Sequence, residues 1–158
     1  MTCVDFYILP DDQLSSLFEY ACKLAQKNWQ SGNRVLIQTD SAQDSQQLDD
    51  LLWNISADSF LPHAIATLEP VDQQQPILIS HQKIIDNNFQ QVINLSSRPA
   101  DIQPDSDRNS EQTGNTALRI NEILNQDEQR KQASRVNYKT YRELGYTLEH
   151  HTLETPNG

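Results

Sequence analysis

Apolar residues along this chain fall into two patterns: short continuous runs and longer stretches with a helical period. Residues 3–9 and 34–39 are runs rich in β-branched and aromatic side chains, which is typical of strands buried on both faces. Between them, residues 14–29 carry apolar side chains at helical spacing, with Asp11 and Asp12 as candidates for the N-cap. A strand, a helix and a second strand form a βαβ unit, so the two strands are predicted to be a parallel pair.

Further elements follow in the same alternation of strand and helix. A second helix is predicted with Asp40 or Ser41 as its cap and with its apolar residues between 48 and 53. Residues 118–124 alternate apolar and polar side chains, which predicts a half-exposed strand. This order of elements predicts an α/β fold: one three-layer, Rossmann-like domain with a mostly parallel central sheet. The other short runs predicted as strands are residues 63–68, 77–80, 91–95 and 146–150.

The longest predicted helix spans residues 125–145, with no Pro or Gly in its interior. Asn125 and Glu128 have the spacing of a capping box, and Gly145 can adopt the left-handed conformation that ends a helix. At about 100° per residue, two groups of residues fall on opposite faces. One face carries Ala133, Val136, Thr140 and Leu144, and the other carries Lys131, Arg135, Tyr138 and Arg142, with Lys139 beside them.

The charge of this helix is opposite to that of the rest of the chain. The chain has 22 acidic and 12 basic residues, a net charge of −10. Residues 130–142 hold five of the basic residues and no acidic one, so this segment carries +5 and the remainder −15. Such a stripe attracts a local anion while the rest of the surface repels long polyanions. The alternative is a solvated helix face whose cations pair with the chain's own carboxylates.

Two segments have too few apolar residues to predict packed structure. Residues 96–116 are almost entirely polar, and residues 152–158 form a polar tail. Long polar segments of this composition do not bury enough surface to fold by themselves. We therefore expect a mobile segment at 96–116 and a frayed C-terminal tail at 152–158 within a single domain of residues 1–158.

Composition and motifs argue against several functional classes. The four glycines are too far apart for a dinucleotide fingerprint or a phosphate-binding loop, and no G-x-S-x-G motif occurs. The four histidines are scattered, and neighbouring His150 and His151 would point to opposite sides of a strand, so no metal site and no cofactor is predicted. Cys3 and Cys22 lack ligand spacing, which favours reduced thiols in a cytoplasmic protein. No apolar run approaches the ~20 residues of a membrane span.

Several stretches, taken in order along the chain, resemble the chi subunit of bacterial DNA polymerase III, an accessory subunit of the clamp loader. They are F-Y-I-L at 6–9, W-Q-S-G-N-R-V-L-I at 29–37, L-D-D-L-L-W with S-F-L-P-H at 48–53 and 59–63, and R-V-N-Y-K-T-Y-R-E-L-G-Y at 135–146. The third and fourth stretches are specific together, whereas each alone is weak. The chain departs from the family pattern at 96–116, where relatives carry a more apolar segment.

The resemblance implies a non-catalytic protein with a Rossmann-like fold and no bound nucleotide, acting in the bacterial cytoplasm at the replisome. Chi proteins form a heterodimer with the psi subunit, which tethers them to the clamp loader. They also bind the acidic, apolar-ended C-terminal tail of single-stranded-DNA-binding protein. Transferred to this chain, the surface for psi, shared in some bacteria with a helicase, consists of Trp53, Phe60 and Pro62.

The tail-binding site implied by the resemblance coincides with the basic helix. It consists of Lys131, Arg135 and Tyr138, with Lys139 and Arg142 alongside. A terminal aromatic residue needs an apolar pocket beside these cations, for which Leu124, Tyr138 and Leu148 are the candidates. Two other functions stay open at this point: a small nucleotide-binding protein or enzyme with a Rossmann-like fold, and direct but weak binding of nucleic acid by the helix. The acidic balance disfavours tight binding of bare DNA, because neutralising phosphates requires many basic residues.

Overall fold

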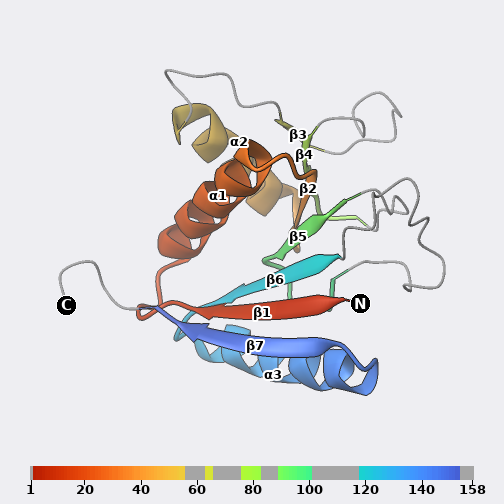
Figure 1. The fold of residues 1–158 in the computed structure, drawn as a ribbon. Coiled ribbons are helices and arrows are strands. Elements are labelled where there is room, and N and C mark those ends of the chain that lie inside the picture. Colours follow the sequence, from red (N-terminus) through yellow and green to blue (C-terminus); the bar gives the residue numbers. More distant parts are fainter. Residues whose placement is uncertain (1, 56–62, 66–75, 83–88, 101–117, 154–158) are drawn as a thin grey trace.

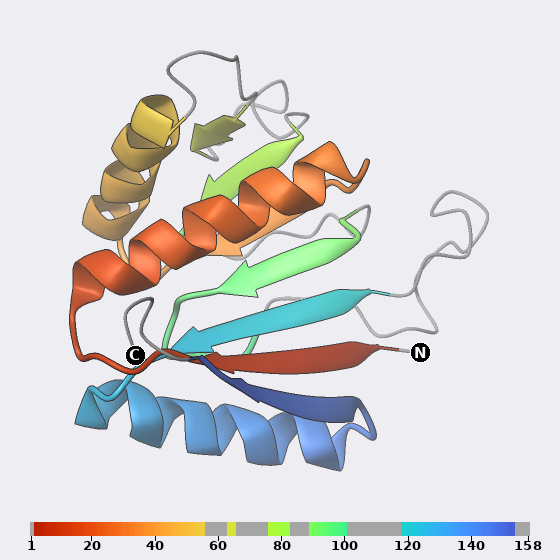
Figure 2. The same ribbon diagram turned by 60° about the vertical axis from the view of Figure 1, so that its left-hand side comes forward.

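The computed structural model describes residues 2–55, 63–65, 76–82, 89–100 and 118–153. These residues form a seven-stranded sheet in which every pair of neighbouring strands is parallel, in the order β3-β4-β2-β5-β6-β1-β7. Helices α1 and α2 cover one face of the sheet and α3 covers part of the other, so the fold has three layers (Figures 1 and 2). The predicted α/β class is confirmed. The elements are β1 (Cys3–Ile8), α1 (Leu14–Gln30), β2 (Val35–Gln38), α2 (Ala42–Ile55), β3 (His63–Ile65), β4 (Ile77–Ser80), β5 (Gln91–Asn94), β6 (Arg119–Leu124), α3 (Glu128–Glu143) and β7 (Thr147–Thr152).

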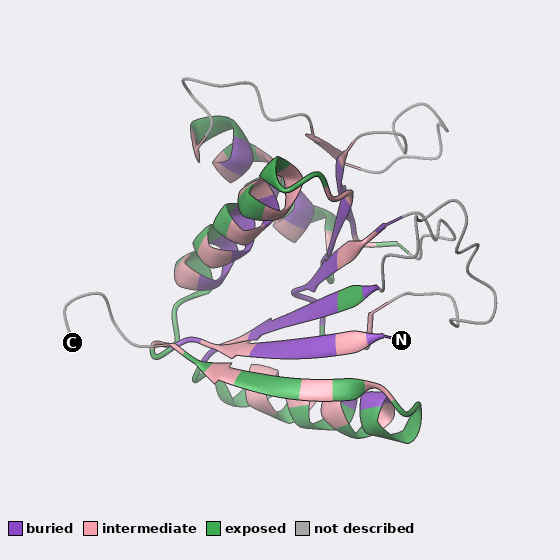
Figure 3. Cartoon of the chain, in the orientation of Figure 1, coloured by how far each residue is buried: buried purple, intermediate pink, exposed green. Residues whose placement is uncertain are grey.

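Two hydrophobic cores lie on the two faces of the sheet. Successive residues of a strand point to opposite faces, so a strand inside a three-layer fold is apolar at most of its positions. In β2, Val35 and Ile37 join the core beneath α1 and α2, whereas Leu36 joins the core on the α3 side. Figure 3 shows the result: the central strands are buried along most of their length, whereas β7, at the edge of the sheet, is largely exposed.

The first βαβ unit differs from the predicted pair in one respect. Strands β1 and β2 are parallel, but they are not neighbours, because β5 and β6 lie between them. Strand β1 pairs with β6 on one side and β7 on the other, in a register that aligns Phe6 with both Glu122 and His150. The two strands that separate β1 from β2 come later in the chain, and nothing local to residues 3–39 indicates where they insert.

Strand β6 was predicted to be half-exposed, and this prediction is wrong. The strand lies in the interior of the sheet, and the four residues from Ile120 to Ile123 are all buried. Its polar side chains have partners in the fold: the Asn121 amide donates to the Val92 carbonyl at 3.2 Å, and Glu122 accepts from Tyr141 and Asn94. Polar residues that are hydrogen-bonded inside the protein produce the same alternating pattern as residues exposed to solvent.

The helix caps differ in part from those predicted. Ser41 caps α2, since its hydroxyl accepts from the Asp44 amide at 3.1 Å. The N-cap of α1 is Gln13, and Asp11 accepts from the Gln13 amide instead of capping the helix itself. For α3 the cap is Asp127, which accepts from the Arg130 amide at 3.0 Å, so the predicted capping box from Asn125 does not form. The predicted stop is confirmed: Gly145 has a φ of +82°.

Replacing Asp127 by Ala should destabilise the protein by about 1 kcal/mol, because the substitution removes the side-chain cap of α3 and leaves the Arg130 amide without its acceptor. Urea unfolding measures the change. Glu128→Ala removes a carboxylate from the same turn without removing a cap and should change stability much less. Equal losses in the two variants would show that charge at the start of α3 matters and that the cap does not.

Helix α3 is rotated relative to the orientation that its apolar residues suggest. Val136 and Leu144 are 63% and 58% exposed, while Asn137 and Tyr141 are the buried residues of the helix. The Tyr141 hydroxyl donates to the Glu122 carboxylate of β6 and accepts from the Ala100 amide at 2.7 Å. A polar connection between helix and sheet, and not an aliphatic stripe, therefore sets the rotation of α3.

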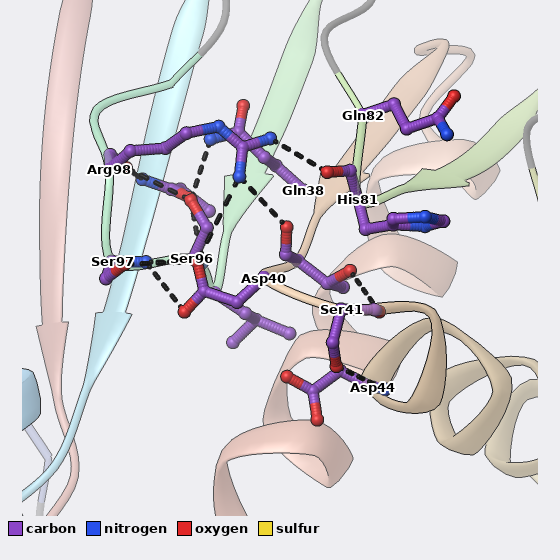
Figure 4. A network of polar contacts seen from close by, with 12 residues as sticks. Gln38, Asp40, Ser41, Asp44, His81, Gln82, Ser96, Ser97 and Arg98 are labelled. Carbon is purple, nitrogen blue, oxygen red and sulfur yellow. Dashed lines mark hydrogen bonds and ion pairs between the residues drawn. The ribbon is translucent and has the colours of Figure 1, made fainter.

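The segment predicted to be mobile begins with ordered residues. Ser96 is buried, the Ser97 amide donates to Asp40 at 2.9 Å, and the Arg98 guanidinium donates to the His81 carbonyl at 3.4 Å (Figure 4). These contacts join the loop after β5 to the loops after β2 and β4. Residues 101–116 of the predicted mobile segment and residues 154–158 of the predicted frayed tail lie outside the described residues. Among the helices described, none is long and apolar enough to span a membrane.

Candidate functional site

A cavity of about 500 Å³ lies between α3 and the β6-β1-β7 part of the sheet. We call it the α3 cavity. Two cations from α3, Lys131 and Arg135, stand at its wall. Its remaining surface is largely apolar and aromatic, which is the composition of a site that takes a mostly apolar group with a charged end. The apolar and aromatic residues that line it are Phe6, Ile8, Leu124, Tyr138 and His150.

Three rings form one side of the α3 cavity. The rings of Phe6 and His150 are nearly parallel, with centroids 5.2 Å apart and an angle of 19° between their planes. Tyr138 of α3 lies 5.5 Å from Phe6 and 5.3 Å from His150. The cluster combines a helix and two strands, so it is held by the body of the fold. Such a cluster offers edges and faces against which another aromatic ring can pack.

The cations of the α3 cavity are only weakly engaged by the chain's own carboxylates. Lys131 lies 3.8 Å from Glu128, an exposed partner in the same helix, and an exposed pair of this kind contributes little. Within the part of the chain that the structure describes, no ion pair involves Arg135. Arg130 has a structural role instead, because its guanidinium donates to the Leu95 carbonyl at 3.0 Å. The alternative in which all of these cations are neutralised by the body of the protein therefore does not hold for Arg135.

The structure brings together four of the seven residues predicted for the basic site: Leu124, Lys131, Arg135 and Tyr138. The other three do not line the cavity. Lys139 and Arg142 are exposed on α3, and Leu148 packs, half-buried, against the core on the α3 side. Phe6, Ile8 and His150 were not predicted as site residues. Phe6 and His150 are register partners on neighbouring strands, a relation that depends on the β1-β7 pairing and not on sequence spacing.

A second cavity, of about 340 Å³, lies at the carboxyl ends of the strands, where ligands bind in many open α/β sheets. Four carboxylates line it, and its basic lining residue is Arg130. A site with this excess of negative charge disfavours phosphate groups, so the cavity does not support the nucleotide-binding alternative. The four acidic residues are Asp12, Asp40, Glu122 and Asp127.

Glu122 is the buried acid of this second cavity, whereas the other three are exposed. Burial raises the pKa of its carboxyl to about 7, although hydrogen bonds from Tyr141, Asn94 and Asn137 favour the charged form. The Asn94 amide donates to Glu122 at 2.7 Å and to the Arg98 carbonyl at 2.8 Å. The Glu122 carboxyl therefore joins α3 to β5 and, through Asn94, to the loop after β5. These contacts account for Glu122 as a residue that stabilises the fold.

A third polar cluster, around Asp5, lies on the face of the sheet opposite α3. The carboxylate of Asp5 is buried and pairs with Arg119 of β6 and, at 3.0 Å, with Nε2 of His151 of β7. The hydrogen bond from Arg119 to Asp5 raises the pKa of the guanidinium. Glu149 lies 3.9 Å from the same His151 nitrogen. These atoms are close enough to share a cation, but Arg119 already supplies positive charge to Asp5, so we assign the cluster to ion pairing between β1, β6 and β7.

Of the three residues of the predicted aromatic docking surface, the structure describes only Trp53. Trp53, at the end of α2, is 52% exposed, and its ring centroid lies 4.8 Å from that of His63. His63 in turn contacts Asp49 of α2 at 3.2 Å. Phe60 and Pro62 lie outside the described residues. Trp53 lies on α2 and the α3 cavity lies beside α3, and these two helices cover opposite faces of the sheet (Figure 1). A substitution at Trp53 is therefore not expected to disturb the cavity.

Comparisons with solved structures identify the fold. The C-terminal domain of the DEAD-box protein Dbp5 matches with a TM-score of 0.61 and 11% identity, over 95% of this chain and 90% of that one. T4 UvsW matches with a TM-score of 0.60 and 9% identity, over 97% of this chain and 42% of that one. At such low identity these matches concern the fold alone.

Comparisons of sequence identify the family. Residues 1–149 match the family model described as DNA polymerase III chi subunit, HolC. DNA polymerase III subunit chi of Pseudomonas aeruginosa is 31% identical over 97% of this chain and 98% of its own length. The chi subunits of Escherichia coli and Haemophilus influenzae are 28% and 29% identical, each over 90% of this chain and 92% of their own length. The chain therefore belongs to the chi-subunit family of DNA polymerase III.

Proposed function

We propose that this chain is a non-catalytic accessory subunit that connects the clamp loader, through psi, to the acidic C-terminal tail of single-stranded-DNA-binding protein during replication. One observation supports the tail-binding part most directly. On a chain of net charge −10, a ring-lined apolar cavity lies beside two cations, and one of them, Arg135, has no ion pair within the described part of the chain. This combination fits a negatively charged peptide end that also carries an apolar residue.

In the proposed complex, the aromatic ring and the carboxylate of the peptide end contact different parts of the cavity. The terminal aromatic side chain occupies the apolar part of the cavity, against Leu124 and the rings of Phe6 and Tyr138. Its carboxylate lies toward Arg135, whose planar guanidinium can hold two oxygens at once, and Lys131 provides a second cation. Lys139 and Arg142, exposed farther along α3, attract the acidic residues upstream through longer-range charge. Negative charge elsewhere on the chain disfavours bare nucleic acid.

The test is a titration of labelled tail peptide, acidic and ending in a free aromatic residue, against the purified chain. We expect micromolar affinity that weakens as salt is added, because the contacts are partly ionic. A matched peptide with an amidated C-terminus keeps the ring and removes the terminal charge, so it should bind much more weakly. Salt-independent binding, or equal binding of the amidated peptide, would contradict the proposal. Tighter binding to a bare oligonucleotide than to the peptide would favour direct nucleic-acid binding instead.

Trp53→Ala should weaken binding of psi about tenfold or more, because large aromatic side chains carry much of the energy in protein interfaces. Tail affinity should stay within about twofold of wild type, since the two surfaces lie on separate helices and distant sites act independently. Both affinities are measurable by calorimetry on the same preparation. The control is Leu14→Ala, which removes an exposed apolar side chain at the start of α1. A folded Trp53 variant that keeps full psi affinity would remove Trp53 from the docking surface.

A further inference from the structure

His150 occupies a position in the α3 cavity that the basic helix alone does not explain. It lies on β7, on the sheet face that carries α3, in register with Phe6 of β1, which is in turn in register with Glu122 of β6. The ring lies nearly parallel to that of Phe6 and beside that of Tyr138, so its orientation is fixed by packing. The residue is nevertheless exposed, and it lines the same cavity as Lys131 and Arg135.

The surroundings leave the ring nitrogens of His150 available to a ligand. Among the residues that the structure describes, no hydrogen bond or ion pair involves its imidazole. Helix α3 contributes the permanent cations Lys131 and Arg135 and the phenol of Tyr138 to the same cavity. Strand β1 contributes only the apolar Phe6 and Ile8 here. The neighbours of His150 on β7, Glu149 and His151, point to the opposite face of the sheet.

One further titratable group lies on the same face. Glu122 is separated from His150 by the ring of Phe6, in the same row across the sheet. Its pKa, raised by burial to about 7, means that it also changes charge in the range where histidine does. A pH dependence of ligand binding can therefore be assigned to His150 only in a background where Glu122 cannot ionise.

We propose that His150 is a third anion-binding group of the α3 cavity, and that its protonation makes the cavity a pH-dependent receptor for a peptide carboxylate. The inference rests on the proposed tail-binding function and adds to it. Histidine changes charge between about pH 5 and 8. A bound carboxylate favours the charged imidazolium, so binding takes up a proton. Affinity for the carboxylate then rises as the pH falls.

The experiment measures affinity for the labelled tail peptide with a free C-terminus between about pH 5.5 and 8, in the Glu122→Gln background. We expect roughly fivefold tighter binding at the acidic end, the size of one additional partly exposed charge-assisted contact. His150→Phe keeps a ring packed on Phe6 and removes the charge. The ratio of the affinity at the acidic end of the range to that at the basic end should therefore fall to near one. His150→Lys, with a permanent charge, should also remove the dependence. His151→Gln, on the opposite face, is the matched control and should retain it.

A second measurement, of the protons taken up on binding, does not depend on comparing the affinities of variants. Calorimetric titrations in buffers of different ionisation enthalpy report the protons taken up on binding, and His150→Phe should reduce this uptake. An unchanged ratio or unchanged uptake in His150→Phe would overturn the inference. Binding of the peptide without any pH dependence in the Glu122→Gln background would overturn it while leaving the tail-binding function standing. No binding at any pH would overturn both.

Discussion

Arg135→Ala should weaken binding of the acidic tail about thirtyfold, a loss of about 2 kcal/mol in binding free energy. Arg135 lines the α3 cavity and, within the described residues, has no carboxylate partner, so its guanidinium is available to the ligand. Removing it leaves the peptide carboxylate in the cavity with Lys131 as its main counter-charge. The measurement is fluorescence anisotropy of the labelled peptide at constant salt.

The matched control is Arg142→Ala. This substitution removes the same charge from the same helix, and both side chains are exposed, but Arg142 does not line the cavity. We expect a loss of no more than about threefold, because a charge outside the cavity acts on the peptide through solvent and salt. Arg135→Lys adds a second comparison: it keeps the charge and loses the two-pronged geometry, so it should fall between wild type and Arg135→Ala. Equal losses in Arg135→Ala and Arg142→Ala would mean that helix charge, and not the cavity, attracts the peptide.

Glu122→Gln should stabilise the protein at neutral and higher pH by up to roughly 3 kcal/mol. Burial raises the pKa of Glu122 to about 7 from an ordinary value of 4.5, so the unfolded chain releases this proton at lower pH than the folded one. The stability that depends on protonated Glu122 is complete below about pH 4.5 and is lost as the pH rises to about 7. Gln keeps an oxygen that accepts from Tyr141 and Asn94 but cannot ionise.

The test is urea unfolding of wild type and Glu122→Gln across this pH range. Below the ordinary pKa of a glutamate the two proteins should have similar stability, and the difference should grow as the pH rises. Glu128→Gln neutralises an exposed carboxylate on α3 and should leave the pH profile of wild type nearly unchanged. If Glu122→Gln were destabilised by the same amount at every pH, the hydrogen bonds from Tyr141 and Asn94 would hold Glu122 charged in the native protein.

Much of the fold was predictable because the interior strands are apolar on both faces. The runs that became β1, β2, β4 and β5 were recognised, with bounds within two residues of those in the structure. Strand β6 was recognised but placed at the surface, because the buried Glu122 and Asn121 look like solvent-facing residues until their partners are known. The order of strands was not predictable, since pairing in a parallel sheet joins segments more than a hundred residues apart, such as β1 and β6.

The candidate site also contains some residues that were predictable from the sequence and others that were not. Lys131, Arg135 and Tyr138 were predictable because helical periodicity and charge are local properties of one segment. Phe6, Ile8 and His150 were not, because they reach the cavity only through the pairing of β1 with β7. The orientation of α3 against the sheet was not predicted. The contact of Tyr141 with Glu122 leaves Val136 and Leu144 in solvent.

The most direct test of the central claim, that the α3 cavity receives the end of an acidic peptide, is an isotope-filtered nuclear Overhauser experiment on the complex. The peptide carries an unlabelled terminal phenylalanine, and the chain is isotopically labelled. We expect contacts from the terminal ring to side-chain protons of Phe6, Leu124, Tyr138 and His150. Contacts confined to the outer face of α3, at Val136 or Leu144, or to the second cavity around Glu122, would contradict the account.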